Sequence, residues 1–284
     1  MSDDRRHGLT IIGFVGSVFS PYYAAARKRG AGDPGNFCCI NVALYGETRR
    51  WAMTERAARF VDQSKDAFHV GPSSMAWDER GLTVNIHEIC SPIPFPLRGE
   101  VRLTPGALYD APVALDAAGR HHWRAVATDA RIEVNLTAPN LSWSGTAYHD
   151  MNWGEEPLEA AFRDWTWSRA ETAEGTTVLY DVTTVANERR AFGRHFAKGE
   201  VSEHPLASHH ELPRGLWGMR RPILSEQPPR LMLKLEDAPF YTRNHVELTL
   251  GGKPVDAVHE SLSLTRFSHP VVQWMLPFRM PRRG

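Results

Sequence analysis

The sequence predicts a mainly β protein of sandwich or barrel architecture, and three observations support this fold class. Apolar and polar residues alternate in several short stretches, turn-forming residues separate these stretches, and helical patterns are few and short. At 284 residues the chain is long enough to bury a sizeable core in one large β architecture or in two domains. We expect two β units of comparable length, residues 1–158 and residues 159–284.

The N-terminal segment is expected to fold as a first strand followed by a turn. The apolar run Leu9 to Phe19, with two arginines before it and three alanines after it, also imitates a secretory signal with a cleavage site. Acidic residues before this run, and glycines and a proline that interrupt it, favour the folded strand; they are Asp3, Asp4, Gly13, Gly16 and Pro21. A short basic helical turn is expected over residues 24–29.

Period-two alternation predicts most of the later strands. The segments that show strand patterns are residues 82–86, 131–136, 178–182, 231–235, 246–250 and 262–267. Turns are predicted at Arg80-Gly81, Pro105-Gly106, Glu174-Gly175 and Gly251-Gly252. One short helix is expected between Glu156 and Phe162, because Pro157 stands where the first helical residue would be.

Composition excludes several classes of function. Lys+Arg and Asp+Glu balance at 33 each without a long run of one sign, so a nucleic-acid partner held by a basic surface is not expected. The three cysteines, Cys38, Cys39 and Cys90, fit neither a disulfide framework nor a zinc spacing, which favours buried thiols in a reducing compartment. His204, His209 and His210 lack spaced acidic partners, so no metal site is predicted.

The stretch from Tyr148 to Pro157 is the strongest functional signal. If it begins as a strand, Tyr148 and Asp150 share one face and His149 points to the other. The densest aromatic segment, residues 162–167, follows it. A carboxylic acid beside a phenol and indoles suits protonation of an apolar substrate, whereas the alternative is an ionised turn or cap residue that accepts backbone N–H bonds.

Several strings resemble the acyclic carotenoid 1,2-hydratases (hydroxyneurosporene synthases) of phototrophic bacteria. The matching stretches are residues 13–23, 41–46, 51–56, 148–157 and 165–169. The shorter His-Asp-x-Asn-Trp-Gly core at residues 149–154 is also similar to a wider lipocalin-like superfamily of carriers, hydratases and pericyclases. The resemblance implies two lipocalin-like β units in tandem, each a barrel or sandwich, with the acid site in the first.

The resemblance also implies addition of water, without a cofactor, across the terminal 1,2 double bond of neurosporene, lycopene or a related carotene. Asp150 would be the proton donor, with Tyr148, Trp123 and His121 as its companions. Trp153, Trp165 and Trp167 are expected to bind the substrate. Such chemistry requires an acid that burial keeps protonated, aromatic faces that stabilise the carbocation, and a group such as His121 that orients and deprotonates water.

Two other functions remain open at this point. A lipocalin-like carrier would hold an apolar polyene without chemistry, and a relative that cyclises or isomerises a polyene would use the same acid but exclude water. Because the substrate would reside in membranes, we expect a cytoplasmic protein in peripheral contact with the inner or intracytoplasmic membrane. The basic runs at residues 218–221 and 279–283 are candidate contacts with anionic lipid.

Overall fold

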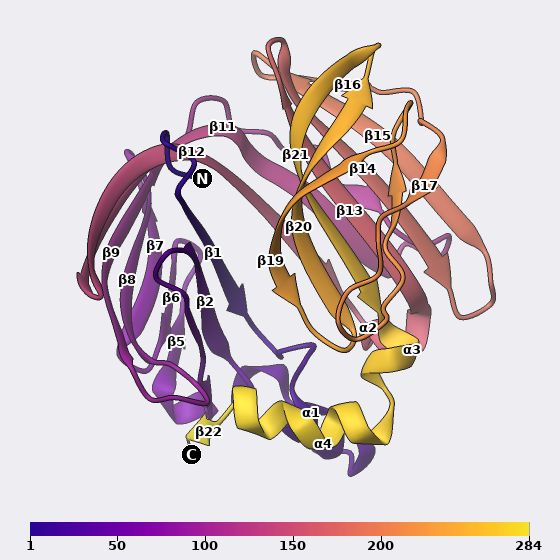
Figure 1. Cartoon of the computed structure of the whole chain (residues 1–284). Coiled ribbons are helices and arrows are strands. Elements are labelled where there is room, and N and C mark those ends of the chain that lie inside the picture. The colour runs from indigo at the N-terminus through magenta and orange to yellow at the C-terminus, as the bar shows by residue number, and fades with distance from the viewer. Residues whose placement is uncertain (284) are drawn as a thin grey trace. The chain divides into compact units, whose positions relative to one another are not determined.

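The computed structural model describes residues 1–283, and these residues form two compact units (Figure 1). The units are interleaved along the chain, which passes between them within β11 (His121–Ala138), at residues 129–130, and within β12 (Asn140–Gly154), at residues 147–148. They therefore do not follow a single division of the chain at residue 158. Unit 1 contains residues 1–106, 130–147 and the chain from 273 onward, and unit 2 contains residues 107–129 and 148–272.

Unit 1 contains a small sheet and a larger sheet, both antiparallel. The small sheet has the order β1-β2-β3, and its strands are β1 (His7–Phe14), β2 (Cys39–Gly46) and β3 (Arg50–Met53). The larger one continues from β11 through β9 (Pro96–Thr104), β8 (Gly81–Ile89), β7 (Ser73–Asp78), β6 (Ala67–Val70) and β5 (Val61–Gln63). The short strands β4 (Glu55–Arg56) and β22 (Arg282–Arg283) form a parallel pair.

Unit 2 is built on a seven-stranded antiparallel sheet (Figure 1). In sheet order its strands are β16 (Glu200–Glu203), β15 (Arg189–Ala197), β14 (Gly175–Thr184), β13 (Phe162–Thr172), β21 (Lys253–Ser263), β20 (Tyr241–Leu250) and β19 (Arg230–Asp237). The hairpin of β17 (His209–Glu211) and β18 (Pro222–Leu224) contributes to an apolar core with Leu179, Val246 and Leu248 from one face of this sheet. The short strand β10 (Val113–Ala114) pairs with the start of β11.

The helices are short. Helix α1 (Pro21–Lys28) begins where Pro21 supplies a preset φ and the Ser20 hydroxyl accepts the Tyr23 N–H. The other α-helices are α2 (Leu158–Ala161), α3 (Leu264–Phe267) and α4 (Pro270–Arg279), and two 3₁₀ turns span Pro34–Asn36 and Ala58–Phe60. No helix within residues 1–283 combines the length and the apolar character needed to cross a membrane.

Most sequence-based expectations for the elements are confirmed, with four corrections. The mainly β class holds, but each sheet in the described chain ends at edge strands, so the barrel option is not what is found. The strand expected over residues 262–267 ends at Ser263, and α3 follows, with Leu264 and Phe267 buried. Pro157 occupies the N-cap position before α2, whereas it was expected to be the first helical residue. Helix α4 was not expected, although Pro270 at its start is a recognisable signal.

Candidate active site

Trp123, Tyr148 and Asp150 come together within unit 2. Trp123 lies in β11 and is fully buried, while Tyr148 and Asp150 lie in β12. The Trp123 Nε1–H donates a hydrogen bond of 2.8 Å to Asp150 Oδ2, and the Tyr148 hydroxyl donates one of 3.2 Å to the same oxygen. The alternation of strand residues therefore places the phenol and the carboxyl group on one face, as the sequence predicted.

The environment of Asp150 favours its protonated form. Burial is the largest influence and raises the pKa of this carboxyl group from 3.8 to about 6. The hydrogen bonds from Trp123 and Tyr148 act in the opposite direction, and the negative charge of Glu260 raises the pKa further. Asp150 is thus neither an exposed turn residue nor a helix cap, and it keeps its proton to a higher pH than an ordinary aspartate does.

Aromatic rings surround the acid. The Tyr148 ring lies 5.5 Å from that of Trp167, and the Trp123 ring lies 5.6 Å from that of Tyr180. Tyr180 in turn stacks on Phe192 at 5.3 Å and meets the edge of Trp165 at 6.1 Å. These π faces are suited to stabilising a developing positive charge.

Tyr180, Phe192 and Asn152 also belong to this cluster, although none of the three was assigned a role from the sequence. The Asn152 amide donates a hydrogen bond of 3.1 Å to the Tyr180 hydroxyl. Burial raises the pKa of that hydroxyl far above its ordinary value, so Tyr180 is a neutral phenol. Strand periodicity places Tyr180 on the same face as Val178 and Val182, but only the observed register places it opposite Trp167 and diagonally next to Trp165.

Charged side chains also lie on the face of the unit 2 sheet that carries Trp167 and Tyr180. The Arg169 guanidinium lies 5.2 Å from the centre of the Tyr148 ring, a cation–π contact. Arg243 Nε lies 2.7 Å from Glu260 Oε1, and both side chains are largely buried. Burial raises the pKa of Tyr148 well above its usual value, with the charge of Asp150 adding to the shift, so the phenol stays a hydrogen-bond donor.

The remaining predicted residues lie in distinct surroundings. His121 is buried beside Phe162, and its Nε2 lies 3.2 Å from the Glu156 carbonyl oxygen, so this contact is with Glu156 and not with Asp150. Burial lowers the pKa of His121. Trp153 is 42% exposed and stacks on His122 at 5.2 Å. Burial also lowers the pKa of His149, to about 4, so that imidazole is neutral.

Asp116, His121 and Glu156 offer potential metal-ligand atoms within 4.8 Å of one another. The Arg120 guanidinium already lies 3.0 Å from Glu156 Oε2 and 3.9 Å from Asp116 Oδ2. Asp116 Oδ1 accepts the backbone N–H groups of Arg120 and His121, and these bonds lower its pKa. A divalent cation would compete with this arginine, so the arrangement is better described as a partly exposed ion-pair network.

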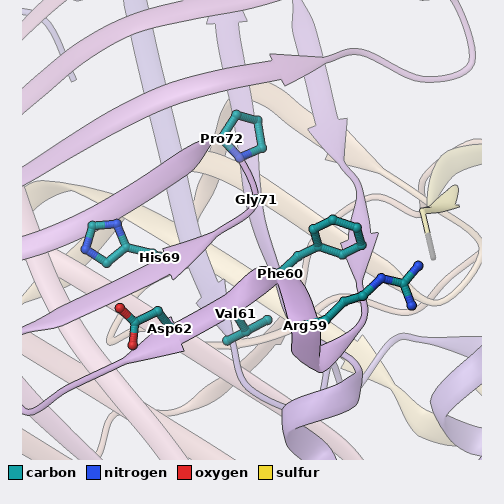
Figure 2. A pocket seen from close by; sticks show the side chains of 7 residues that line it. All are labelled: Arg59, Phe60, Val61, Asp62, His69, Gly71 and Pro72. Carbon is teal, nitrogen blue, oxygen red and sulfur yellow. The ribbon is translucent and has the colours of Figure 1, made fainter.

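An open hollow of about 550 Å³ lies in unit 1 and contains none of the acid-site residues (Figure 2). It is lined by Arg59, Phe60, Val61, Asp62, His69, Gly71 and Pro72 (Figure 2). Its walls bring together no buried acid and no group of stacked aromatic rings. The surroundings of Asp150 therefore remain the candidate active site.

The chain is a mainly β protein whose unit 2 holds a buried carboxyl group, hydrogen-bonded to an indole and a phenol among aromatic rings. A solved structure from Nitrosomonas europaea described as AttH matches 80% of this chain and 80% of its own with a TM-score of 0.61 and 13% sequence identity, a likeness of fold alone. The family model for carotenoid hydratase CrtC matches residues 11–284. The chain belongs to this carotenoid hydratase family.

Two full-length relatives support the assignment. The acyclic carotenoid 1,2-hydratase of Thiocapsa roseopersicina is 50% identical over the whole of this chain and 71% of its own length. The enzyme of the same name from Rubrivivax gelatinosus is 44% identical over the whole of this chain and 72% of its own length. The resemblance found in separate strings of the sequence therefore extends along the entire chain, including its last hundred residues.

Proposed function

We propose that this protein adds water, without a cofactor, across the terminal 1,2 double bond of an acyclic carotenoid such as neurosporene or lycopene, as part of carotenoid biosynthesis. The observation that carries the proposal is the buried Asp150 carboxyl group, held by Trp123 and Tyr148 among aromatic rings. An alkene is a weak base, so its protonation requires an acid that is still protonated at working pH and has no competing water around it.

The proposed reaction has two steps. The Asp150 O–H bond breaks as a C–H bond forms at C2, which leaves a tertiary carbocation at C1. Trp123 and Tyr148 stabilise this cation through their ring faces, an interaction worth about 2 kcal/mol when desolvated. A water molecule then forms the C1–O bond. We assign to His121 the orientation of that water, and to Trp153, Trp165 and Trp167 contacts with the polyene.

The experiment that tests this proposal uses the purified protein with lycopene or neurosporene in liposomes, in ¹⁸O-labelled water and without added cofactor. We expect mass spectrometry to find a labelled 1-hydroxy carotenoid that the Asp150→Asn variant does not form, although the variant still binds pigment. Carotene recovered unchanged in complex with the wild-type protein would instead support a carrier. A cyclised or isomerised product without added oxygen would contradict hydration.

The proposal extends to the fold and to the cellular location of the enzyme. We propose that the two β units are both lipocalin-like, and that the protein works in the cytoplasm in peripheral contact with the inner or intracytoplasmic membrane. An apolar surface in unit 1 supports the membrane contact. Trp274 and Phe278 of α4 are 70% and 60% exposed, and Ile93 and Phe95 of a neighbouring loop are 60% and 47% exposed.

These four residues, which we call the α4 apolar surface, carry the features of a lipid-binding surface. The Ser91 hydroxyl donates a hydrogen bond of 2.6 Å to the Phe278 carbonyl oxygen, which joins the loop to the helix. Arg50 lies over the Phe95 ring and Arg279 over the Trp51 ring, at 4.7 and 4.3 Å. Exposed aromatic residues with arginines beside them match the boundary between acyl chains and anionic headgroups.

A further inference from the structure

Water addition requires a base as well as an acid, because the water that attacks C1 must lose a proton. The histidines next to the acid site are poorly placed for this step, and His245, on the Glu260 face of β20, lies 3.4 Å from Asp256. His259 lies on the opposite face of the sheet, where Ser168 Oγ and Ser261 Oγ lie 2.8 and 3.0 Å from its ring nitrogens, and its pKa is lowered to about 3. His149 points away from the Asp150 face of β12, and His121 Nε2 is engaged with Glu156.

A second carboxylate lies on the same sheet face as the aromatic rings of the acid site. Glu260 in β21 is paired in register with Trp167 of β13 and with Arg243 of β20. Directly opposed residues of antiparallel strands project from the same face of a sheet. Since the Trp167 ring contacts the Tyr148 ring and the Tyr148 hydroxyl bonds to Asp150, Glu260 belongs to the face that carries the acid.

Glu260 forms a largely buried ion pair with Arg243. Arg243 Nε donates the 2.7 Å hydrogen bond to Oε1, and the side chain of Glu260 keeps 20% of its surface exposed. Other charged or titratable groups on this face are Arg169 from β13, Tyr180 from β14, Arg194 from β15, Tyr241 and His245 from β20, and Tyr148 and Asp150 from β12. The negative charge of Glu260 raises the pKa of both Asp150 and Tyr180, so the groups are electrostatically coupled.

We propose that Glu260 is the base that accepts the proton of the attacking water, an inference that rests on the hydratase function proposed above. As the C1–O bond forms, one O–H bond of the water breaks and its proton passes to the Glu260 carboxylate. That proton then returns through water to Asp150, which regenerates both groups, and the net reaction adds one water molecule to the alkene. Arg243 holds Glu260 in place and restrains its carboxylate from attacking the carbocation itself.

The assignment of Asp150 as the acid and Glu260 as the base has a physical reason. Two carboxyl groups in different environments can hold different protonation states at one pH, and a site with one protonated and one ionised carboxyl can supply acid and base together. Asp150 accepts hydrogen bonds only from neutral donors in an apolar setting, whereas Glu260 has a guanidinium partner. The acid and the base are therefore distinguished by their partners.

The test compares Glu260→Gln with wild-type protein in hydration assays in D₂O. Loss of a general base reduces turnover by about 10²- to 10⁴-fold, and we expect that range for the glutamine variant. Asp150 can still protonate C2 reversibly, so the recovered carotene should gain deuterium even though little hydroxylated product forms. Glu260→Asp, which keeps the carboxylate, should recover part of the turnover.

Glu247→Gln is the matched control, because Glu247 pairs with Arg230 at 3.2 Å across strands of the same sheet, away from the acid. We expect its turnover to equal that of the wild type. A second readout separates catalysis from folding: without the charge of Glu260 the pKa of Asp150 falls, so the high-pH limb of the activity profile should move to lower pH.

Two results would overturn the assignment of Glu260. In the first, the wild-type protein hydrates carotene and the turnover of Glu260→Gln lies within a factor of about three of the wild-type value. So small a loss of turnover is far below the loss expected when a general base is removed. The other is a Glu260→Gln variant with reduced turnover, no deuterium in the recovered carotene and an unmoved pH profile, which would indicate a structural role. If the wild-type protein itself forms no hydroxylated product, the hydratase proposal fails and the base assignment fails with it.

Discussion

At the scale of single residues, the proposed role of Asp150 as proton donor predicts how activity depends on pH. The proton donor must be protonated, and its pKa is raised to about 6, so turnover should fall as pH rises through that value. The pH dependence of the turnover number in liposome assays measures this limb. A profile that stays flat from pH 5 to about 8 would contradict Asp150 as the acid.

The raised pKa of Asp150 also predicts that the free energy of unfolding depends on pH. The folded protein binds the Asp150 proton more tightly than the unfolded chain does, so this stabilising contribution is complete below the unfolded pKa of 3.8 and is lost as pH rises through about 6. The asparagine of Asp150→Asn needs no ionisation, and its stability should exceed that of wild type at pH 8 by an amount approaching about 3 kcal/mol. Urea unfolding of both proteins at pH 5 and pH 8 tests this, and a difference independent of pH would contradict it.

Substitutions of Trp123 separate the ring from its hydrogen bond. Both Trp123→Phe and Trp123→Ala remove the indole N–H that lowers the pKa of Asp150, so both should move the high-pH limb of activity upward. Only the alanine variant loses the aromatic face and opens a cavity at a fully buried position, which costs about 3–5 kcal/mol of stability. We therefore expect the phenylalanine variant to retain more turnover, and equal losses would argue against stabilisation of the cation by the ring.

At the scale of elements, the turn between β20 and β21 fixes the register that places Arg243 opposite Glu260. Gly251 and Gly252 have φ values of +57° and +72°, and their N–H groups bond to the Glu226 carboxylate at 2.7 and 2.8 Å. An alanine at Gly252 should lower the free energy of unfolding by about 1 kcal/mol, because left-handed backbone suits glycine. Chemical denaturation measures this change, with Gly35→Ala as a control at a glycine without positive φ.

The elements also show how far the sequence could be interpreted. Period-two alternation identified the strands that contain residues 82–86, 178–182 and 246–250, and it placed Tyr148 and Asp150 on one face. Periodicity carries no information on which strands become neighbours, so the pairing of Glu260 with Trp167 and Arg243 was not predictable. A strand was predicted over residues 262–267, but residues 264–267 form α3. A short apolar run that becomes buried is compatible with either a strand or a helix, so its pattern could not distinguish the two.

At the scale of the whole molecule, the two units are not consecutive pieces of the chain. Strand β11 contributes residues 121–129 to unit 2 and residues 130–138 to unit 1, and no local composition signal marks this passage. Trp123 and Asp150 nevertheless both belong to unit 2, with Tyr148 and Glu260. The candidate site is thus assembled by strand pairing between distant segments, which explains why its aromatic partners Tyr180 and Phe192 escaped notice in the sequence.

The proposed membrane contact predicts how the whole protein distributes between water and lipid. Anionic lipid attracts the arginines beside the α4 apolar surface, with about 1 kcal/mol for each cation near the headgroups, and the exposed rings enter the acyl boundary. The protein should therefore sediment with vesicles of phosphatidylcholine and phosphatidylglycerol more than with phosphatidylcholine alone. Trp274→Ser combined with Phe278→Ser should weaken this binding at least tenfold, whereas Leu216→Ser, at a residue 89% exposed in unit 2, should not.

The same variants identify what covers this surface. In labelled-water assays the double variant should hydrate detergent-dispersed carotene as the wild type does but lose turnover on carotene held in vesicles, because its chemistry is intact and only its access to the bilayer is reduced. If vesicle binding is unchanged while the wild-type protein is dimeric in solution and the double variant monomeric, the surface is an interface between copies of this chain. Equal losses in detergent and in vesicles would show that α4 supports the fold, since damage to the acid site does not depend on how the substrate is presented.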